Sequence, residues 1–363
     1  MSRDGDKYRV TPGRKKTFFY VTFFHFTSAF HDQRHINKRR ELSFMPQLMP
    51  DASKYIFKDN FINRYSQLTN WEQFKQYSLS FLRKSIRVNI LKISIEECKK
   101  RLEKKGWKLT PIPWCNQGFW IEHPTRRDVG NLWEHHMGYF YVQEAASMIP
   151  PIVLEPQPDE AILDMAASPG SKTTQIASLM KNTGVLVAND YKADRLAALG
   201  MNVQRVSATN IIITLTHGQR LKKVQFDRIL LDAPCSGTGT IAKSLKTIQM
   251  WNPTMVQRLQ KQQLQLIEQA WSLLKADGTL VYSTCTLEPE EDEAVISEHL
   301  KNHEDAVIET IKENELKGLK RSPAVTEFEK EKYHPDVKHC LRIWPQDNYT
   351  EGFFVARLRK TNS

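Results

Sequence analysis

Residues 226–239 read FDRILLDAPCSGTG and pass from an apolar run into chemically reactive side chains. The apolar run 229–231 is typical of a strand that is buried on both faces of a parallel sheet. Asp232 and Cys235 follow where this strand ends, and ligands of open α/β sheets bind outside the carboxyl ends of the strands. We therefore expect both side chains to lie at a site of binding or catalysis.

The same alternation of strand and helix continues on both sides of this stretch. We predict further strands at 161–165, 185–189, 211–215, 279–284 and 353–358, and helices at 172–181, 192–208, 253–274 and 290–300. Strands that alternate with amphipathic helices are typical of an α/β fold with a doubly wound parallel sheet.

A second strand-to-helix turn lies earlier in the chain, at LDMAASPGSKTT, residues 163–174. Small residues at such a turn let the backbone approach a nucleotide-like ligand, and Asp190, twenty residues after Gly170, could hold ribose hydroxyls. A phosphate-binding P-loop is disfavoured because Ser171 separates Gly170 from Lys172 and no glycine lies five residues before Gly170. A dinucleotide or S-adenosylmethionine is the expected ligand.

A second thiol follows a predicted strand in STCT, residues 283–286. A single cysteine in such a place is often only a small apolar residue. Cys235 and Cys285 at the same edge of one sheet favour a chemical role. The five cysteines are odd in number and lack paired CxxC spacing, so we expect reduced thiols in a cytoplasmic protein and neither disulfides nor a metal site.

Length and charge indicate two domains and a polyanionic partner. The chain has 363 residues and a formal net charge of +11, which favours nucleic acid. We expect an irregular extension at 1–45, a smaller α+β domain at 46–145 and the doubly wound domain at 146–363. No run of eighteen apolar residues occurs, so no membrane contact is expected. A monomer is our default for the assembly.

The predicted smaller domain holds features that suit an RNA surface. In FLRKSIRVNILK, residues 81–92, basic residues alternate with apolar ones, which predicts a strand with one basic face. Tryptophans at 107, 114 and 120 stand near lysines and could stack on unpaired bases. A solvated basic face is the equally supported alternative for the strand, and packing is favoured for most of the tryptophans. We also predict a helix over 139–150.

One reaction uses a nucleotide-like cofactor, a carboxylate and two thiols together. The C5 carbon of cytosine is a poor nucleophile until a thiolate adds to C6, after which C5 can accept a methyl group from S-adenosylmethionine and the thiol is expelled. Asp232 could hold the base near N3 and its amino group, and a neighbouring thiol could assist release. The residues alone do not rank the two thiols.

The motifs DMAASPGSKTT, LLDAPCSGTG and LVYSTCTLEPEEDEAV resemble those of the Nop/Sun group of RNA cytosine-5 methyltransferases. The resemblance extends through SIRVNILKIS and EGFFVARLRK and covers about residues 83–360. It implies a Rossmann-like methyltransferase domain behind an N-terminal RNA-binding region, S-adenosylmethionine as cofactor, and cytosine in small-subunit (16S) ribosomal RNA, free or in the small ribosomal subunit, as substrate. The same chemistry on tRNA or another rRNA is the alternative.

The resemblance also implies roles for individual residues. Cys285 would attack C6, Cys235 would help to release the product, and Asp232 would lie between cofactor and base. The loop that would contact the cofactor consists of Ala166, Ala167, Ser168, Pro169, Gly170, Ser171 and Lys172. Asp190 would hold the ribose. DNA cytosine methyltransferases place the nucleophile in a Pro-Cys motif, so the opposite assignment of the thiols stays open.

Two features of the chain differ from the family pattern. His217-Gly218 stands where the family usually has Asp-Gly, and a protonated imidazole cannot accept a hydrogen bond from adenine, so we expect pH-sensitive cofactor binding. The nearest relatives carry further C-terminal RNA-binding domains, whereas this sequence ends soon after the last predicted strand. We expect this difference to affect the efficiency and substrate choice of this chain. An amino-group methyltransferase would need Asn/Asp-Pro-Pro-aromatic in place of residues 232–235, and a non-catalytic RNA-binding or assembly factor is the remaining alternative.

Overall fold

The computed structural model describes residues 46–221 and 224–362. From Pro46 on, the chain forms one compact unit, and the predicted irregular extension at 1–45 lies outside the described residues. Among the helices of the described ranges, none has the length and apolar character needed to cross a membrane.

In the described part of the chain, the largest sheet has eight strands, in the order β10-β14-β9-β8-β5-β6-β7 with β13 paired to β14. The neighbours from β9 to β7 run parallel, which confirms the predicted doubly wound α/β fold. The strands are β5 (Ala161–Asp164), β6 (Val185–Asp190), β7 (Ile211–Leu215), β8 (Phe226–Asp232), β9 (Leu274–Thr284), β10 (Ala306–Ile308), β13 (Leu341–Ile343) and β14 (Phe353–Lys360).

The last predicted strand is present, and it runs against its neighbour. β14 pairs antiparallel with β9, with Phe354 opposite Thr284, and β10 and β13 also pair antiparallel with β14. An apolar run indicates a buried strand but carries no information on its direction. This antiparallel edge brings the segment just before β14 next to the carboxyl end of β9.

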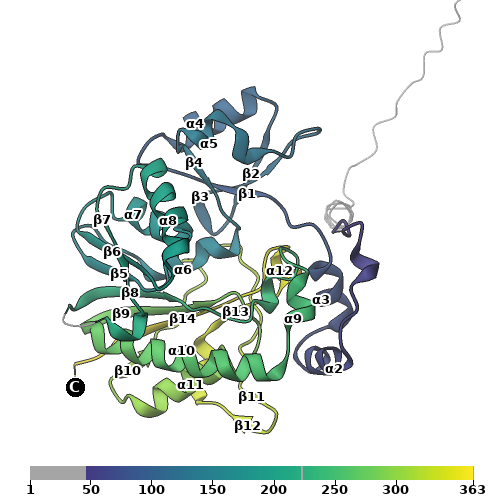
Figure 1. Ribbon diagram of the computed structural model, residues 1–363, viewed down its shortest axis with the longest axis vertical. Helices are drawn as coiled ribbons and strands as arrows, with labels where there is room; N and C mark the ends of the chain where they lie inside the picture. Colours follow the sequence, from purple (N-terminus) through teal and green to yellow (C-terminus); the bar gives the residue numbers. More distant parts are fainter. Residues whose placement is uncertain (1–45, 222–223, 363) are drawn as a thin grey trace, which may run out of the picture. The chain divides into compact units, whose positions relative to one another are not determined.

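Helices cover both faces of the sheet, as Figure 1 shows. Leu231 and Tyr282 face α10 and α11, whereas their neighbours Leu230 and Val281 face α6 and α7. This alternation follows from the two-residue period of a strand. The helices are α6 (Ile149–Leu154), α7 (Ser171–Leu179), α8 (Ala193–Val206), α10 (Pro253–Leu273) and α11 (Glu293–Asn302).

A four-stranded antiparallel sheet in the order β2-β3-β1-β4 precedes this core. Its elements are β1 (Ser85–Val88), α4 (Ile95–Lys104), β2 (Lys108–Ile112), β3 (Cys115–Glu122) and β4 (Phe140–Val142). The predicted basic face of the first strand is wrong, because all four residues of β1 are buried. Arg87 donates a hydrogen bond to Thr174 Oγ1 at 2.9 Å and packs inside the protein.

Trp107, Trp114 and Trp120 are buried, which confirms the packing that was favoured for most of them.

The predicted helix over 139–150 is wrong. Residues Phe140–Val142 form β4, and the helix α6 begins only at Ile149. A strand of three residues is too short for its period to be read from sequence, and its partner β1 lies about fifty residues away.

The first helices, α2 (Asp59–Leu68) and α3 (Trp71–Ser78), pack on the large domain. Phe61 and Tyr65 share one apolar cluster with Trp251 and Trp344. The predicted boundary at 145/146 falls in continuous structure beside the short turn Ala146–Met148 and stays a prediction. The remaining short elements are α5 (Trp133–His136), α9 (Lys246–Met250), α12 (Pro345–Asn348), β11 (Glu327–Phe328) and β12 (Glu331–Lys332).

Candidate active site

The two candidate thiols meet at the carboxyl edge of the large sheet. β8 and β9 are parallel neighbours, and Asp232 lies opposite Ser283 in their register. Cys235 and Cys285 follow these positions, and their Sγ atoms lie 3.3 Å apart. The neighbouring strands β5 and β8 form the point at which the strand order reverses, which is where doubly wound sheets bind ligands.

Backbone hydrogen bonds hold the two thiol-bearing loops together. Gly239 donates from its N–H to the Cys285 carbonyl at 3.0 Å and accepts from the N–H of Gly352 at 2.9 Å. A Cβ atom at Gly239 would lie 2.3 Å from the Gly352 carbonyl oxygen, so only glycine allows this approach. The glycine in the Pro-Cys motif therefore fixes the distance between the two loops.

Asp232 accepts hydrogen bonds from two sides. Ser283 Oγ donates to one carboxylate oxygen at 2.9 Å and Lys172 Nζ donates to the other at 2.8 Å. Lys172 also donates to Ser147 Oγ at 3.1 Å. Burial alone would lower the pKa of Lys172, but the charge and hydrogen bond of Asp232, together with nearby Cys285 and Asp164, raise that pKa. The ammonium group therefore stays charged and fixes the orientation of the carboxylate.

Two cavities meet at these side chains. Cavity A, of about 230 Å³, lies beside the ends of β6 and β8, and cavity B, of about 340 Å³, lies toward β14 and β4. Both are lined by Ala166, Ser168, Asp232 and Cys285. An arrangement with two pockets that share a thiol and a carboxylate can hold two reacting molecules side by side, with the shared groups at their junction.

The expected cofactor loop divides between the two cavities. Ala166 and Ser168 line both, whereas Ala167, Pro169, Ser171 and Lys172 line cavity B. Gly170 has a φ of 101° and ends the turn directly before α7, a conformation that glycine adopts without strain. Lys172 forms an ion pair with Asp232 on the side of cavity B, and its expected contact with a cofactor stays a prediction.

Asp190 lies at the end of β6 and is almost fully buried. Its carboxylate accepts hydrogen bonds from the N–H groups of Ser168 and Lys192, each at 3.2 Å. Its chain neighbours Asn189 and Tyr191 line cavity A. The expectation that Asp190 holds a ribose stays a prediction, and in this structure the carboxylate supports the Ser168 backbone.

His217 lines cavity A, where its ring lies 5.7 Å from that of Tyr191. The two aromatic rings and the side chain of Leu266 give this cavity an apolar part that suits a planar base. Tyr191 was not among the expected site residues, because an aromatic residue after a strand carries no signal of its own. The pH-sensitive role proposed for His217 stays a prediction.

The surroundings of Cys235 favour the protonated form of its thiol. The pKa of Cys235 is raised well above its ordinary value by the hydrogen bond to Cys285, by burial and by the nearby carboxylates Glu291 and Asp232. Cys235 therefore keeps its proton near neutral pH and can donate it toward the sulfur of Cys285. Sequence alone could not predict the raised pKa of Cys235, since Glu291 comes from a distant part of the chain.

Two buried carboxyl groups of cavity B were also missed by the sequence analysis. Burial, together with the charge of Glu351, raises the pKa of Glu144 to about 8. Glu351 is nearly fully buried, its pKa is raised mainly by burial, and its Oε1 atom has no hydrogen-bond partner among the described residues. No motif pairs these residues, because one follows β4 and the other precedes β14.

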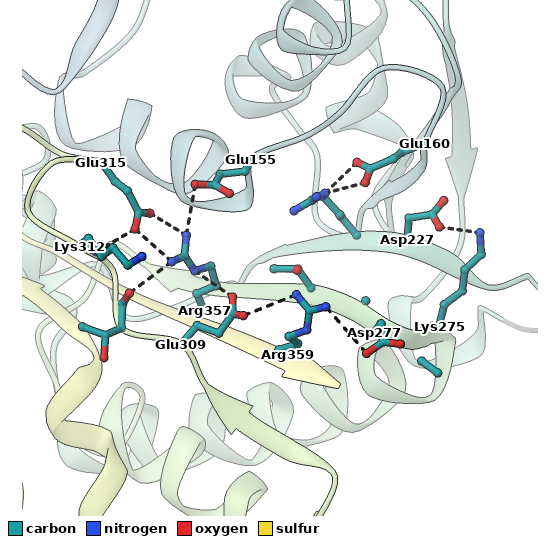
Figure 2. A pocket seen from close by; sticks show the side chains of 15 residues that line it. Glu155, Glu160, Asp227, Lys275, Asp277, Glu309, Lys312, Glu315, Arg357 and Arg359 are labelled. Atoms are coloured by element: carbon teal, nitrogen blue, oxygen red, sulfur yellow. Dashed lines mark hydrogen bonds and ion pairs between the residues drawn. The ribbon is translucent and has the colours of Figure 1, made fainter. Parts of the chain in front are cut away.

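A further cavity lies elsewhere, at the opposite edge of the sheet. It has a volume of about 750 Å³, and its charged side chains are paired with one another. Figure 2 shows Glu309 between Arg357 and Arg359, and Asp227 beside Lys275. It contains neither thiol, and we assign the candidate active site to cavities A and B.

Comparison with known proteins gives consistent similarities. Residues 151–359 match the family described as 16S rRNA methyltransferase RsmB/F, and residues 57–145 match the N-terminal domain of 16S rRNA methyltransferase RsmF. The chain is 42% identical over 297 residues to the ribosomal RNA small subunit methyltransferase F of Shewanella amazonensis, which covers 80% of this chain and 61% of that protein. The chain thus spans about three fifths of the length of that relative.

Two archaeal proteins are similar over nearly their full lengths. A tRNA (cytosine(49)-C(5))-methyltransferase of Pyrococcus abyssi is 44% identical over 302 residues, which is 82% of this chain and 95% of that protein. The crystal structure of a methyltransferase homologue from Pyrococcus horikoshii superposes with a TM-score of 0.76 at 35% identity, covering 86% of this chain and all of the other. These similarities agree with the motifs from which the fold was predicted.

Proposed function

The chain belongs to the family of 16S rRNA methyltransferases RsmB/F, and from this premise we propose that it methylates C5 of a cytosine in small-subunit (16S) ribosomal RNA. S-adenosylmethionine is the proposed methyl donor. The observation that carries the proposal is the pair of thiols of Cys235 and Cys285, 3.3 Å apart where two cavities meet beside Asp232.

Cavity A fits the cofactor in the chemistry of its lining. Tyr191 and His217 offer flat apolar surface for an adenine, and Ser168 and Arg195 offer polar groups for the amino-acid part. When bound, S-adenosylmethionine supplies the methyl group. Cavity B, which shares Cys285 and Asp232 with cavity A, is the proposed pocket for the cytosine, which must leave its stack to enter.

In the proposed mechanism, the thiolate of Cys285 adds to C6 of the cytosine and makes C5 nucleophilic. Asp232, oriented by Lys172 and Ser283, holds the base near N3 and the amino group. After methyl transfer a water molecule takes the C5 proton, the electrons of the C5–H bond form the C5–C6 double bond again, and Cys285 departs as a thiolate. The protonated thiol of Cys235 stabilises that departing sulfur by donating a hydrogen bond to it.

The opposite assignment, with Cys235 as nucleophile, is less well supported. The raised pKa of Cys235 makes a thiolate at this residue unfavourable. We therefore propose Cys285 as the catalytic nucleophile and Cys235 as the group that assists release.

The proposal is tested by methyl transfer from labelled S-adenosylmethionine to unmodified small-subunit rRNA and to small subunits, followed by mapping of the product base. We expect 5-methylcytosine with the parent chain and none with Cys285→Ala. Tight RNA binding without any transfer by the parent would favour the non-catalytic RNA-binding alternative.

A tRNA substrate is the second candidate, favoured by the similarity to the tRNA methyltransferase of Pyrococcus abyssi over 95% of that protein. The same assay with unmodified tRNA separates the two, because the labelled product is mapped on each RNA. We further propose that the chain acts in the cytoplasm as a monomer. All five cysteines are free, which suits a reducing compartment.

A further inference from the structure

A cluster of two histidines and a glutamate lies away from the proposed active site. His299 lies on α11, and His303 directly follows Asn302, the last residue of that helix. Glu268 on α10 reaches between them, with one oxygen 2.9 Å from His299 Nδ1 and the other 2.6 Å from His303 Nε2. All three potential ligand atoms lie within 4.8 Å of one another.

The surroundings of the cluster suit a cation. His299 is fully buried, and its Nδ1 atom faces the carboxylate of Glu268. The side chains of His303 and Glu268 are 25% and 44% exposed, which leaves a path from solvent. Asp305 lies 3.8 Å from His303 Nδ1, on the side away from Glu268, where carboxylates orient metal-binding histidines.

We propose that Glu268, His299 and His303 form a site for a divalent transition-metal ion, with zinc as the best match. Two imidazoles and one carboxylate are ligands that zinc accepts in tetrahedral geometry, with a fourth position left for water. Bonds of about 2.0–2.1 Å in that geometry separate ligand atoms by roughly 3.4 Å. The three ligand atoms lie within 4.8 Å of one another, so binding requires only local adjustment of these side chains.

The site joins the two helices that follow the thiol-bearing loops. α10 follows the Pro-Cys loop of β8, and α11 follows the Thr-Cys loop of β9. Trp271 on α10 packs against the rings of both histidines, at 4.8 and 5.9 Å. A bound ion adds a cross-link to this contact and stabilises the folded chain, since ligands that bind only the folded state raise its stability. This inference stands independently of the proposed function.

The test must separate this cluster from the two thiols, which also attract zinc. The full chain carrying Cys235→Ser and Cys285→Ser is titrated with Co²⁺ and then with Zn²⁺. We expect one Co²⁺ per chain with the visible absorption of a tetrahedral nitrogen and oxygen site, no thiolate charge-transfer band, and displacement by Zn²⁺.

Variants in the same chain with Cys235→Ser and Cys285→Ser locate the ion. His303→Gln should weaken binding on the order of 100-fold or more, because one ligand of three is lost. His334→Gln changes another partly exposed histidine near an aspartate and should leave binding unchanged. Equal affinity in the parent and His303→Gln, or no binding at all, overturns the proposal.

Thermal unfolding provides a readout that does not depend on the histidine variants folding equally well. Zn²⁺ should raise the Tm of the chain with Cys235→Ser and Cys285→Ser. It should leave the Tm unchanged when Glu268→Gln is added to that chain. Glutamine keeps the shape of the side chain and its acceptor oxygen but loses the charge. A Zn²⁺-induced rise of equal size in both chains contradicts the assignment.

Discussion

Cys235 and Cys285 carry the same side chain in loops that follow neighbouring strands, and their Sγ atoms lie 3.3 Å apart. The hydrogen bond to Cys285, burial and the charge of Glu291 raise the pKa of Cys235. Asp232 is held by Lys172 and Ser283 and lines both cavities. At this scale the function depends on which groups keep their protons and which are fixed in orientation.

The Asp232→Asn substitution tests the role of the fixed carboxylate. An amide weakens the ion pair with Lys172 and cannot act as a charged acceptor for the base, so the single-turnover rate of methyl transfer should fall about 100-fold or more. Asp227→Asn is the matched control, because Asp227 forms a similar pair with Lys275, at 2.7 Å, on the opposite edge of the sheet (Figure 2). A rate for Asp232→Asn within a few-fold of that control contradicts the role.

At the scale of elements, buried ion pairs hold the segments around the thiol-bearing loops in place. Arg342 of β13 is fully buried and donates to Glu293 at 2.9 Å, to Asp292 at 3.0 Å and to the Leu287 carbonyl at 3.0 Å. Arg64 of α2 donates to Glu288 at 2.7 Å. The segment after Cys285 is therefore held between α2 and β13.

Removing Arg342 should be strongly destabilising. Arg342→Met leaves two buried carboxylates without their cation, and breaking a buried pair in this way costs about 3–5 kcal/mol in the free energy of unfolding. Arg359→Met on β14 removes ion pairs from a side chain that is 45% exposed and should cost no more than about 1 kcal/mol. Denaturant unfolding of both variants compares the two, and equal losses would argue against this role of Arg342.

Glu291 links α10 to the Pro-Cys loop. Its carboxylate accepts hydrogen bonds from the Ser236 N–H at 3.0 Å and from Gln263 at 2.8 Å. Burial nevertheless raises its pKa to about 7. Between about pH 4.3, where an unfolded glutamate titrates, and about pH 7, the folded chain holds a proton that the unfolded chain has released. The free energy of unfolding therefore decreases as pH rises through this window.

The Glu291→Gln substitution removes this contribution. Its loss of stability between about pH 5 and about pH 7.5 should be smaller than that of the parent. Glu298→Gln changes an exposed glutamate of α11 and should keep the parental pH dependence. Thermal unfolding across that range measures all three chains. A pH dependence in Glu291→Gln equal to that of the parent would show that this group does not titrate in the window.

The elements that sequence predicted well are those with a local signal. The strand Ile211–Leu215 was predicted with its observed bounds, because its run of β-branched residues is a local signal for a strand. β4 was mistaken for helix, because its strand character comes from pairing with β1. The two thiols were predicted to lie together because each follows a strand. The Lys172–Asp232 pair was not predicted, since it depends on the order of strands in the sheet.

At the scale of the whole molecule, the positive net charge supports the proposed RNA substrate. The net charge is +11, and Lys243 at the rim of cavity B has a side chain that is 71% exposed. The tryptophans and the strand β1, in which the sequence suggested an RNA surface, are buried instead. Exposed lysines and arginines are therefore the groups left to meet the phosphates.

Binding to a small-subunit rRNA fragment should weaken with salt. Each phosphate contact releases counterions, so affinity should fall roughly tenfold or more between about 50 and about 200 mM salt. Fluorescence anisotropy of a labelled fragment measures this directly. The Lys243→Gln variant should show a smaller salt dependence, and affinity that is independent of salt would remove charge as the source of binding.

The most direct test of the two-thiol mechanism is the covalent adduct. Cys235→Ala is incubated with small-subunit rRNA and S-adenosylmethionine, and the products are separated under denaturing conditions and digested for peptide mapping. We predict a protein–RNA adduct that is linked through Cys285 and is absent when Cys285→Ala is added to the same chain. An adduct that forms in Cys285→Ala alone and maps to Cys235 would contradict the assignment of the nucleophile.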